Sequence, residues 1–203
     1  MTLALAFVLL VLTVPLLGGK LGRLEELRLR SVWLAGLAFA LQVLIVTVVP
    51  EGDTGVHRAA HLASYALVGA CMLRNIRLPF LWVVALGGLL NLIAIVANGG
   101  VMPASRSALE SAGLDVRSGS FANSDLVADA RLAFLGDVFA VPAGWPGANV
   151  FSAGDVVMVA GAFLALHAVT GSRLGGALRR SLPGRGLGAE PVGAAPQAPR
   201  PAN

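Results

Sequence analysis

Five long runs of apolar residues constrain this chain more than any other feature of its sequence. A transmembrane helix needs about 20 predominantly apolar residues, with a range of about 17–25. Four of the runs meet that requirement directly, and the third meets it with one turn lent by the connection before it. The sequence therefore predicts an all-α, polytopic membrane protein with about five transmembrane helices. The expected spans are about residues 1–17, 32–49, 59–73, 80–97 and 151–169.

Composition and charge placement exclude other broad classes of protein. The chain is 56% hydrophobic and only 13% charged, whereas soluble domains have roughly 45–50% apolar and about 25% charged residues. Its basic residues flank the apolar runs and do not form a stripe interleaved with aromatic residues, which argues against nucleic-acid binding. The single cysteine, Cys71, rules out an intrachain disulfide and a cysteine-based metal cluster. We expect neither a metal site nor a cofactor.

The distribution of Lys and Arg predicts how the chain is oriented. Eleven of the 15 lie after the first run, after the third run or in the carboxyl-terminal tail, and four lie in the remaining connections. Cytoplasmic segments carry the excess of basic residues, so we expect the amino terminus outside and the carboxyl terminus in the cytoplasm. The first run is followed, not preceded, by its basic residues, which favours a retained helix over a signal peptide.

Two regions are too polar to belong to the membrane. Residues 173–203 are rich in Pro, Gly and Ala, and we expect a disordered cytoplasmic tail after a membrane domain formed by residues 1–172. Residues 98–149 form an outer connection that is long enough to be functional or disordered. Its amphipathic stretches, such as residues 126–139, predict a partly ordered cap with helices that lie on the membrane surface.

Acidic side chains at the outer boundary are the strongest candidates for chemistry. Asp155 opens the last apolar run, where an ionisable group is costly and is treated as functional by default. Two carboxylates that share a proton can activate water and protonate a leaving nitrogen. Asp137 and Asp155 are therefore the candidate catalytic pair of an aspartyl hydrolase, with Asp129 as a substitute. The candidate substrate-binding residues are Asn98, Asn149, Ser152 and Arg131.

Each of these residues also has a structural interpretation. Asn98 precedes two glycines and is compatible with an ordinary helix end. Asp129 and Asp137 could face water on a surface helix, and Ser152 or Asp155 could cap the last helix, whose dipole favours a carboxylate there. Catalysis therefore stays open beside non-enzymatic binding of a lipid, ion or protein. A transporter is less favoured because few polar residues, such as Asn91, Ser64 and Gln42, interrupt the runs.

The histidines indicate no metal site. His57 and His61 are four residues apart, but no nearby acidic pattern completes a ligand set. We interpret them as a polar entry to the third helix. His167 is isolated in the last apolar run, and we expect it to anchor that helix at the membrane interface.

Three motifs carry a resemblance that spans residues 1–171. They are Asn98-Gly99-Gly100-x-Met102-Pro103, then Phe134-Leu135-Gly136-Asp137-Val138 followed by Pro142, then Asn149-Val150-Phe151-Ser152-x-Gly154-Asp155. With these motifs the chain resembles a family of uncharacterised bacterial multi-pass membrane proteins, frequent in actinobacteria and Gram-positive relatives. The family is catalogued as a domain of unknown function. The resemblance implies a bacterial plasma membrane and no known activity.

A second resemblance covers the last third of the chain. Phe151-Ser152-Ala153-Gly154-Asp155 is similar to the Phe-Asn-x-Ala-Asp motif of lipoprotein signal peptidase, whose aspartate is catalytic and faces outward. Asp129-x-Arg131 and Asn98-x-Gly100 are similar to two further motifs of that enzyme. The chain departs from these motifs in three ways. Ser152 stands in place of the motif asparagine, and an extra residue separates Asp129 from Arg131. The signal peptidase has two helices between its Asn-x-Gly motif and its first aspartate, whereas this chain has no apolar run between Asn98-x-Gly100 and Asp129. The implied partners are the lipid bilayer and a lipid or membrane-anchored peptide.

Overall fold

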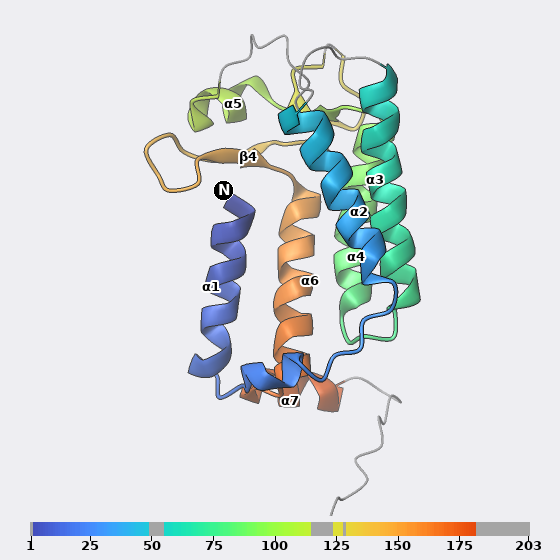
Figure 1. The fold of residues 1–203 in the computed structure, drawn as a ribbon. Coiled ribbons are helices and arrows are strands. Elements are labelled where there is room, and N and C mark those ends of the chain that lie inside the picture. Colours follow the sequence, from blue (N-terminus) through green and yellow to red (C-terminus); the bar gives the residue numbers. More distant parts are fainter. Residues whose placement is uncertain (1, 49–54, 115–123, 128, 182–203) are drawn as a thin grey trace, which may run out of the picture.

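The structure is a computed structural model that describes residues 2–48, 55–114, 124–127 and 129–181 (Figure 1). It is mostly helical, with seven α-helices in the described residues. Five long helices run side by side between two ends, and the two short helices lie at those ends. The long helices are α1 (Thr2–Leu16), α2 (Val32–Val43), α3 (Gly55–Arg74), α4 (Leu81–Ala97) and α6 (Ala153–Thr170).

The long helices coincide in position with the five predicted spans, but they differ in membrane character. Of the helices in the described residues, only α6 is both long and apolar enough to cross a bilayer by itself. Apolar segments of α1, α2 and α4 are shorter. Although α3 has 20 residues, its polar first turns lower its hydropathy. Beyond α2, the chain continues as a π-helical segment, Leu44–Val48, a geometry that frequently occurs next to functional sites.

Glycines allow α4 and α6 to approach each other closely. A Cβ placed on Gly87 of α4 would lie 2.6 Å from the Met158 side chain, and one on Gly161 of α6 would lie 2.6 Å from the Val84 nitrogen. Small residues permit such backbone contact between apolar helices. This close packing sets Asn91 of α4 against the first turn of α6. Around the pair, α3 packs against α4, α2 against α3, and α1 against α6.

Buried hydrogen bonds join α1, α6 and α7 (Arg173–Ser181) at one end of the bundle. His167 Nε2 lies 3.0 Å from Thr13 Oγ1, and His167 Nδ1 lies 2.8 Å from Ser172 Oγ. His167 is fully buried, so the prediction of an interfacial anchor is wrong. Tight packing between three helices keeps its ring away from any surface. Residues 173–181 were expected to be disordered and instead form α7, while residues 182–203 lie outside the described residues.

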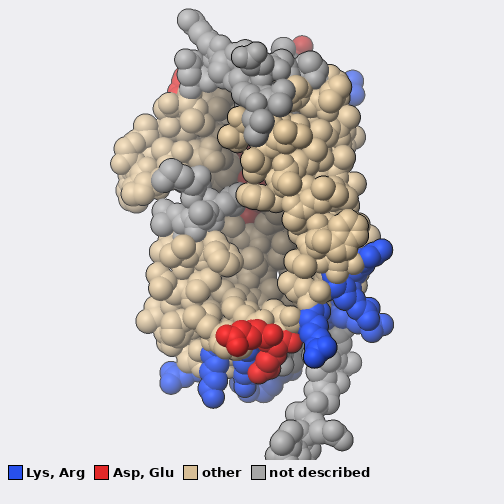
Figure 2. Space-filling model, in the orientation of Figure 1, with Lys and Arg blue, Asp and Glu red and all other residues tan. Residues whose placement is uncertain are grey.

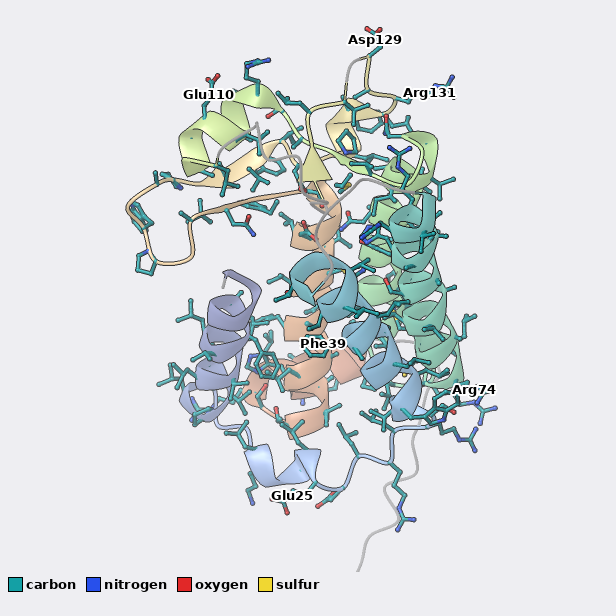
Figure 3. All side chains as sticks on the ribbon, turned by 45° about the horizontal axis from the view of Figure 1, so that its top comes forward. Glu25, Phe39, Arg74, Glu110, Asp129 and Arg131 are labelled. Carbon is teal, nitrogen blue, oxygen red and sulfur yellow. The ribbon has the colours of Figure 1, made fainter. Side chains whose placement is uncertain are left out.

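Basic residues gather at this same end, which we call the basic end (Figure 2). It carries the connections after α1 and α3 together with α7, and Glu25 lies at this end as well (Figure 3). The basic residues of these segments are Lys20, Arg23, Arg28, Arg30, Arg74, Arg77, Arg173, Arg179 and Arg180.

The opposite end, the cap end, contains β-structure as well as a helix, so the fold is not purely α. Strand β1 (Met102–Pro103) pairs in parallel with β2 (Ser124–Asp125), and β3 (Phe139–Val141) pairs antiparallel with β4 (Asn149–Phe151). Helix α5 (Arg106–Ala112) packs on β3 and β4. The hydrophobic core of the cap end consists of Ala104, Ala108, Leu109, Ala112 and Val150.

The helix expected within residues 126–139 is absent from the described part of that segment, which contains a short 3-10 turn, Ala133–Leu135. Asp129 and Leu132 adopt φ angles of 51° and 53°, which interrupt a right-handed helix. Farther along, Asp137 is drawn into a bridge with Ala104. Pairing with the β1 segment thus prevails over the amphipathic pattern in this part of the cap.

Candidate functional site

Asp155 begins α6 as part of a capping box. Its backbone N–H donates to Ser152 Oγ at 3.0 Å, and its Oδ2 accepts from the Ser152 backbone N–H at 2.9 Å. Such reciprocal bonds satisfy N–H groups that a helix start otherwise leaves unpaired. The structural interpretation of Asp155 as a capping residue is therefore confirmed.

Asn91 joins this cap to α4. Its Nδ2 donates to Asp155 Oδ1 at 2.9 Å, and its Oδ1 accepts from Ser152 Oγ at 2.8 Å. Asn91 and Ser152 are buried. Both carboxylate oxygens of Asp155 are thus engaged, and each side chain of the three contacts the other two. We call Asn91, Ser152 and Asp155 the capping triad.

Asp137 reaches the same end of the bundle from the cap. Its N–H donates to the Pro103 carbonyl at 2.8 Å, its own carbonyl accepts from the Ser105 N–H at 3.0 Å, and the residue is 5% exposed. The alternative in which it faces water therefore does not hold. Asp137 and Asp155 both lie close enough to Tyr65 of α3 to act electrostatically on its hydroxyl. The two carboxylates chosen from the sequence thus belong to the cap-side end of the bundle.

Of the other predicted site residues, some lie apart from the triad, and Asn98 hydrogen-bonds backbone groups. Asp129 and Arg131 are exposed and project from the edge of the cap (Figure 3). Asn98 caps α4 and holds the Arg131 backbone, donating from Nδ2 to its carbonyl at 2.8 Å and accepting from its N–H at 2.9 Å. Asn149 is an exposed residue of β4. Among the predicted binding residues, Ser152 hydrogen-bonds Asp155 in the described part of the chain.

A second polar cluster joins α2 to α3, and the sequence interpretation missed its role. Gln42 Nε2 donates to Ser64 Oγ at 2.6 Å and lies 3.0 Å from His61 Nδ1, while Ser64 Oγ donates to the His61 carbonyl at 2.6 Å. The His61 ring packs edge-on against Tyr65. We call Gln42, His61 and Ser64 the Gln42 cluster. The sequence feature that could have indicated this cluster is the presence of three polar residues within the second and third apolar runs.

An apolar pocket extends from the Gln42 cluster toward the basic end. It lies between α2, α3 and α4, reaches Met158 of α6, and has a volume of about 560 Å³. Gln42, Ser64 and Tyr65 are its polar residues and lie at its cap-side end. Phe39 also lines the pocket and is 72% exposed, which places it at the opening. A hollow on the face between α1 and α2 is visible in Figure 2, with acidic atoms in its depth.

The described residues contain no group of three or more His, Cys, Asp or Glu side chains arranged to hold a metal ion. Comparison with protein families matches residues 26–167, well over half of the chain, to a family described as "Family of unknown function (DUF5317)". No curated protein and no solved structure matches the chain significantly.

Proposed function

The chain belongs to this family of unknown function, and we propose that it is a polytopic plasma-membrane protein that binds the apolar chain of a membrane amphiphile between α2, α3 and α4. The proposal includes five spans, α1, α2 with its π-helical extension, α3, α4 and α6. Large apolar side chains on their outer surfaces support it, including Phe7, Leu16, Trp33 and Trp82, each more than half exposed. A bilayer would cover such surfaces, which monomeric soluble proteins rarely expose.

The concentration of basic residues opposite the cap supports an orientation with the cap outside and α7 in the cytoplasm. The amino terminus then faces outward, as the sequence predicted. In that orientation the pocket runs from an outer polar end, at Gln42 and Tyr65, to an inner apolar end near Ile76. An outer-leaflet lipid has the same polarity, with its polar end outward and its chain toward the membrane centre.

The observation that carries the proposal is the segregation of polar and apolar groups within one pocket. Ligand pockets are typically about 300–1,000 Å³, mostly apolar, with a few polar groups that orient the ligand. This pocket has a volume of about 560 Å³ with its polar groups confined to one end. Between Ser64 and Leu73, α3 provides an apolar wall of roughly 13 Å at the usual helical rise. That geometry suits one extended chain with a polar end.

A pocket-filling variant tests the proposal. Gly69 lines the pocket, and a Cβ there would meet nothing within 4 Å, so Gly69→Leu fills the space without a backbone clash. The matched control is Gly36→Leu on α2, which also has open space and does not line the pocket. Both variants are reconstituted in nanodiscs with a long-chain diazirine alcohol, and crosslinked peptides are identified by mass spectrometry.

We expect saturable labelling of pocket peptides in the wild type and in Gly36→Leu, and a loss of about tenfold or more in Gly69→Leu. A tenfold change corresponds to about 1.4 kcal/mol, which the loss of apolar contact along a side chain readily supplies. Unsaturable labelling of the wild type, or equal labelling of all three proteins, would refute the proposal.

One observation favours a second function, an aspartyl hydrolase that acts on a membrane-anchored substrate. Asp137 and Asp155 both lie at the cap-side end of the bundle, within electrostatic range of Tyr65, so the two acids chosen for a hydrolase share one end of the fold. The capping triad weighs against it, since both Asp155 oxygens already accept hydrogen bonds. The test is processing of a lipoprotein precursor in cells depleted of their own signal peptidase. Processing that Asp137→Asn abolishes, at unchanged protein level, would establish the hydrolase over simple binding.

A further inference from the structure

The hairpin formed by β3 and β4 has two faces of different chemistry. Ala140 pairs with Val150, and Phe139 pairs with Phe151. Ala140 and Val150 belong to the core that the hairpin shares with α5. Because successive side chains of a strand point to opposite sides, Phe139 and Phe151 occupy the other face, where their rings stack with centroids 5.4 Å apart. Phe139 is exposed, so the described residues leave this aromatic face partly uncovered.

Charged side chains lie only on the α5 side of this unit. Residues 138–154 include no Asp, Glu, Lys or Arg. Helix α5, which covers the first face of the hairpin, exposes Arg106 and Glu110, and Glu110 projects outward from the cap (Figure 3). The hairpin and α5 together are therefore amphipathic, with a charged outer side and an uncharged aromatic side. The same division of polarity places amphipathic elements in a membrane interface.

The length of α6 determines the level of the hairpin relative to a bilayer. Its 18 residues extend about 27 Å at the usual helical rise, and the hydrocarbon core of a bilayer is about 30 Å thick. Helix α6 ends beside α7 at the basic end, and β4 ends at Phe151, directly before α6 begins. When the basic end lies at the inner boundary of the membrane, the hairpin therefore lies at the outer boundary.

The positions of the three tryptophans agree with this level. Trp33 and Trp82 are the second residues of α2 and α4, and both helices begin at the basic end. Trp145 lies in the loop of the hairpin, and each of the three side chains is more than half exposed. Tryptophan is enriched at both membrane–water interfaces. Two tryptophans thus lie at the level of the inner interface, and Trp145 lies at the level of the outer one.

The loop that carries Trp145 is a fixed part of the cap and extends away from the bundle. The Ala143 N–H donates to the Ser111 carbonyl of α5 at 2.8 Å. Within the loop, the Trp145 N–H donates to the Pro142 carbonyl at 3.2 Å. Figure 1 shows the loop reaching sideways past the start of α1. The loop is therefore held beside the long helices, where a bilayer around the bundle would meet it.

We propose that the β3–β4 hairpin is a membrane-docking element whose aromatic face and Trp145 lie among the headgroups of the outer leaflet. The inference rests on the proposed function, because it uses the same bilayer and the same orientation. It adds a lipid surface as the partner of the cap. Since residues 138–154 are uncharged, the contact is aromatic and apolar, and the depth of Trp145 should be the same in zwitterionic and in anionic bilayers.

Single-tryptophan proteins measure the depth of the hairpin. Trp33→Phe combined with Trp82→Phe leaves Trp145 as the only tryptophan, and Phe keeps an aromatic ring at both exposed positions. The matched control has all three tryptophans replaced by Phe and carries Glu110→Trp, on the charged side of the same cap. Both are reconstituted in phosphatidylcholine nanodiscs, with and without phosphatidylglycerol. The lipids carry bromine at a shallow or a deep acyl position, and acrylamide in the buffer reports access from water.

We expect the fluorescence of Trp145 to be quenched more by shallow than by deep bromine. Quenching by acrylamide should be about threefold weaker than in the Glu110→Trp protein, because an indole at headgroup level is shielded from bulk water. Acrylamide quenching equal to that of the control would overturn the inference. Protection of Trp145 from both quenchers would also overturn it, since another protein surface would then cover the hairpin. Bromine quenching that requires phosphatidylglycerol would contradict the uncharged contact.

A third protein separates failure of this inference from failure of the proposed function. Trp82→Phe combined with Trp145→Phe leaves Trp33, on the outer surface of α2. Bromine quenching of Trp33 without quenching of Trp145 would overturn the docking of the hairpin and leave the membrane spans in place. The absence of bromine quenching from both tryptophans would instead defeat the membrane placement on which the proposed function depends.

Discussion

The capping triad and the Gln42 cluster are built from similar polar residues, yet they differ in how completely their hydrogen bonds are satisfied. In the triad, Asn91 donates to Asp155 and accepts from Ser152, and both Asp155 oxygens are occupied. In the Gln42 cluster, Oε1 is buried without a partner among the described residues. A fully satisfied network rigidifies and specifies the packing around it, whereas an unpaired buried acceptor is unfavourable. The residue most prominent in the sequence, Asp155, therefore lies in the cluster whose hydrogen bonds are satisfied.

The largest effect should come from breaking the saturated network at its centre. Asn91→Leu removes the donor to Asp155 Oδ1 and one of the two acceptors, Asn91 Oδ1 and Asp155 Oδ2, that the buried Ser152 hydroxyl reaches. Leaving one group unpaired costs about 1–3 kcal/mol, and more when the group is a charged carboxylate, so we expect a loss of about 2–4 kcal/mol in the free energy of unfolding. Thermal unfolding in detergent measures it, with the exposed Asn149→Leu as the control. A loss as small as that of the control would show that the triad does not hold α4 to α6.

A smaller loss should follow from removing the acid while keeping the cap residue. Asp155→Ala abolishes one half of the capping box, but Ser152 still accepts from the helix start. Since caps are worth about 0.5–2 kcal/mol, we expect a loss of about 1–2 kcal/mol, below that of Asn91→Leu. Asp155→Asn keeps an oxygen acceptor and should recover part of the loss. If both Asp155 variants are as stable as the wild type, the carboxylate is held for a purpose other than stability.

The Gln42 cluster should respond in the opposite way, with little change in stability. Gln42→Leu ends two hydrogen bonds but also removes the unpaired buried oxygen. Gains and losses of about 1 kcal/mol each then largely offset, and we expect a net change of about 1 kcal/mol or less. The same thermal unfolding experiment compares it with Asn91→Leu. A loss as large as that of Asn91→Leu would mean that the two clusters do not differ in kind.

Whether an element of the fold could be predicted from the sequence depends on how many residues its hydropathy pattern spans. The apolar runs are long and locate α1, α2, α3, α4 and α6, because hydropathy accumulates over many residues. The cap was misjudged because its β-pairs are two or three residues long. Such short pairs depend on contacts between distant segments, such as Ala104 with Asp137. No local pattern in the sequence indicates such contacts between distant segments.

The candidate site shows the same division between local and distant information. The capping role of Ser152 and Asp155 is local, since the two residues are three apart, and it was foreseen as an alternative. The convergence of Gln42 with Ser64 joins two helices across 22 positions. Nothing in either run indicates that partnership, and a single Gln in an apolar helix gives no sign of whether its amide is satisfied. An unpaired acceptor is a property of three-dimensional packing alone.

The smallest effect is expected at Asp129, which the sequence offered as a substitute catalytic residue. Its side chain is exposed at the edge of the cap and projects away from it, so Asp129→Asn, which keeps a residue type that tolerates a positive φ, should change stability by less than about 0.5 kcal/mol. It should also leave labelling of the pocket unchanged, because that pocket lies between α2, α3 and α4. Thermal unfolding and the diazirine assay test both expectations on one preparation. Asp129 has a positive φ of 51°, so Asp129→Gly is the control that relieves the backbone while also removing the carboxylate. Loss of labelling in both variants would assign Asp129 a part in ligand entry that its exposed position does not suggest.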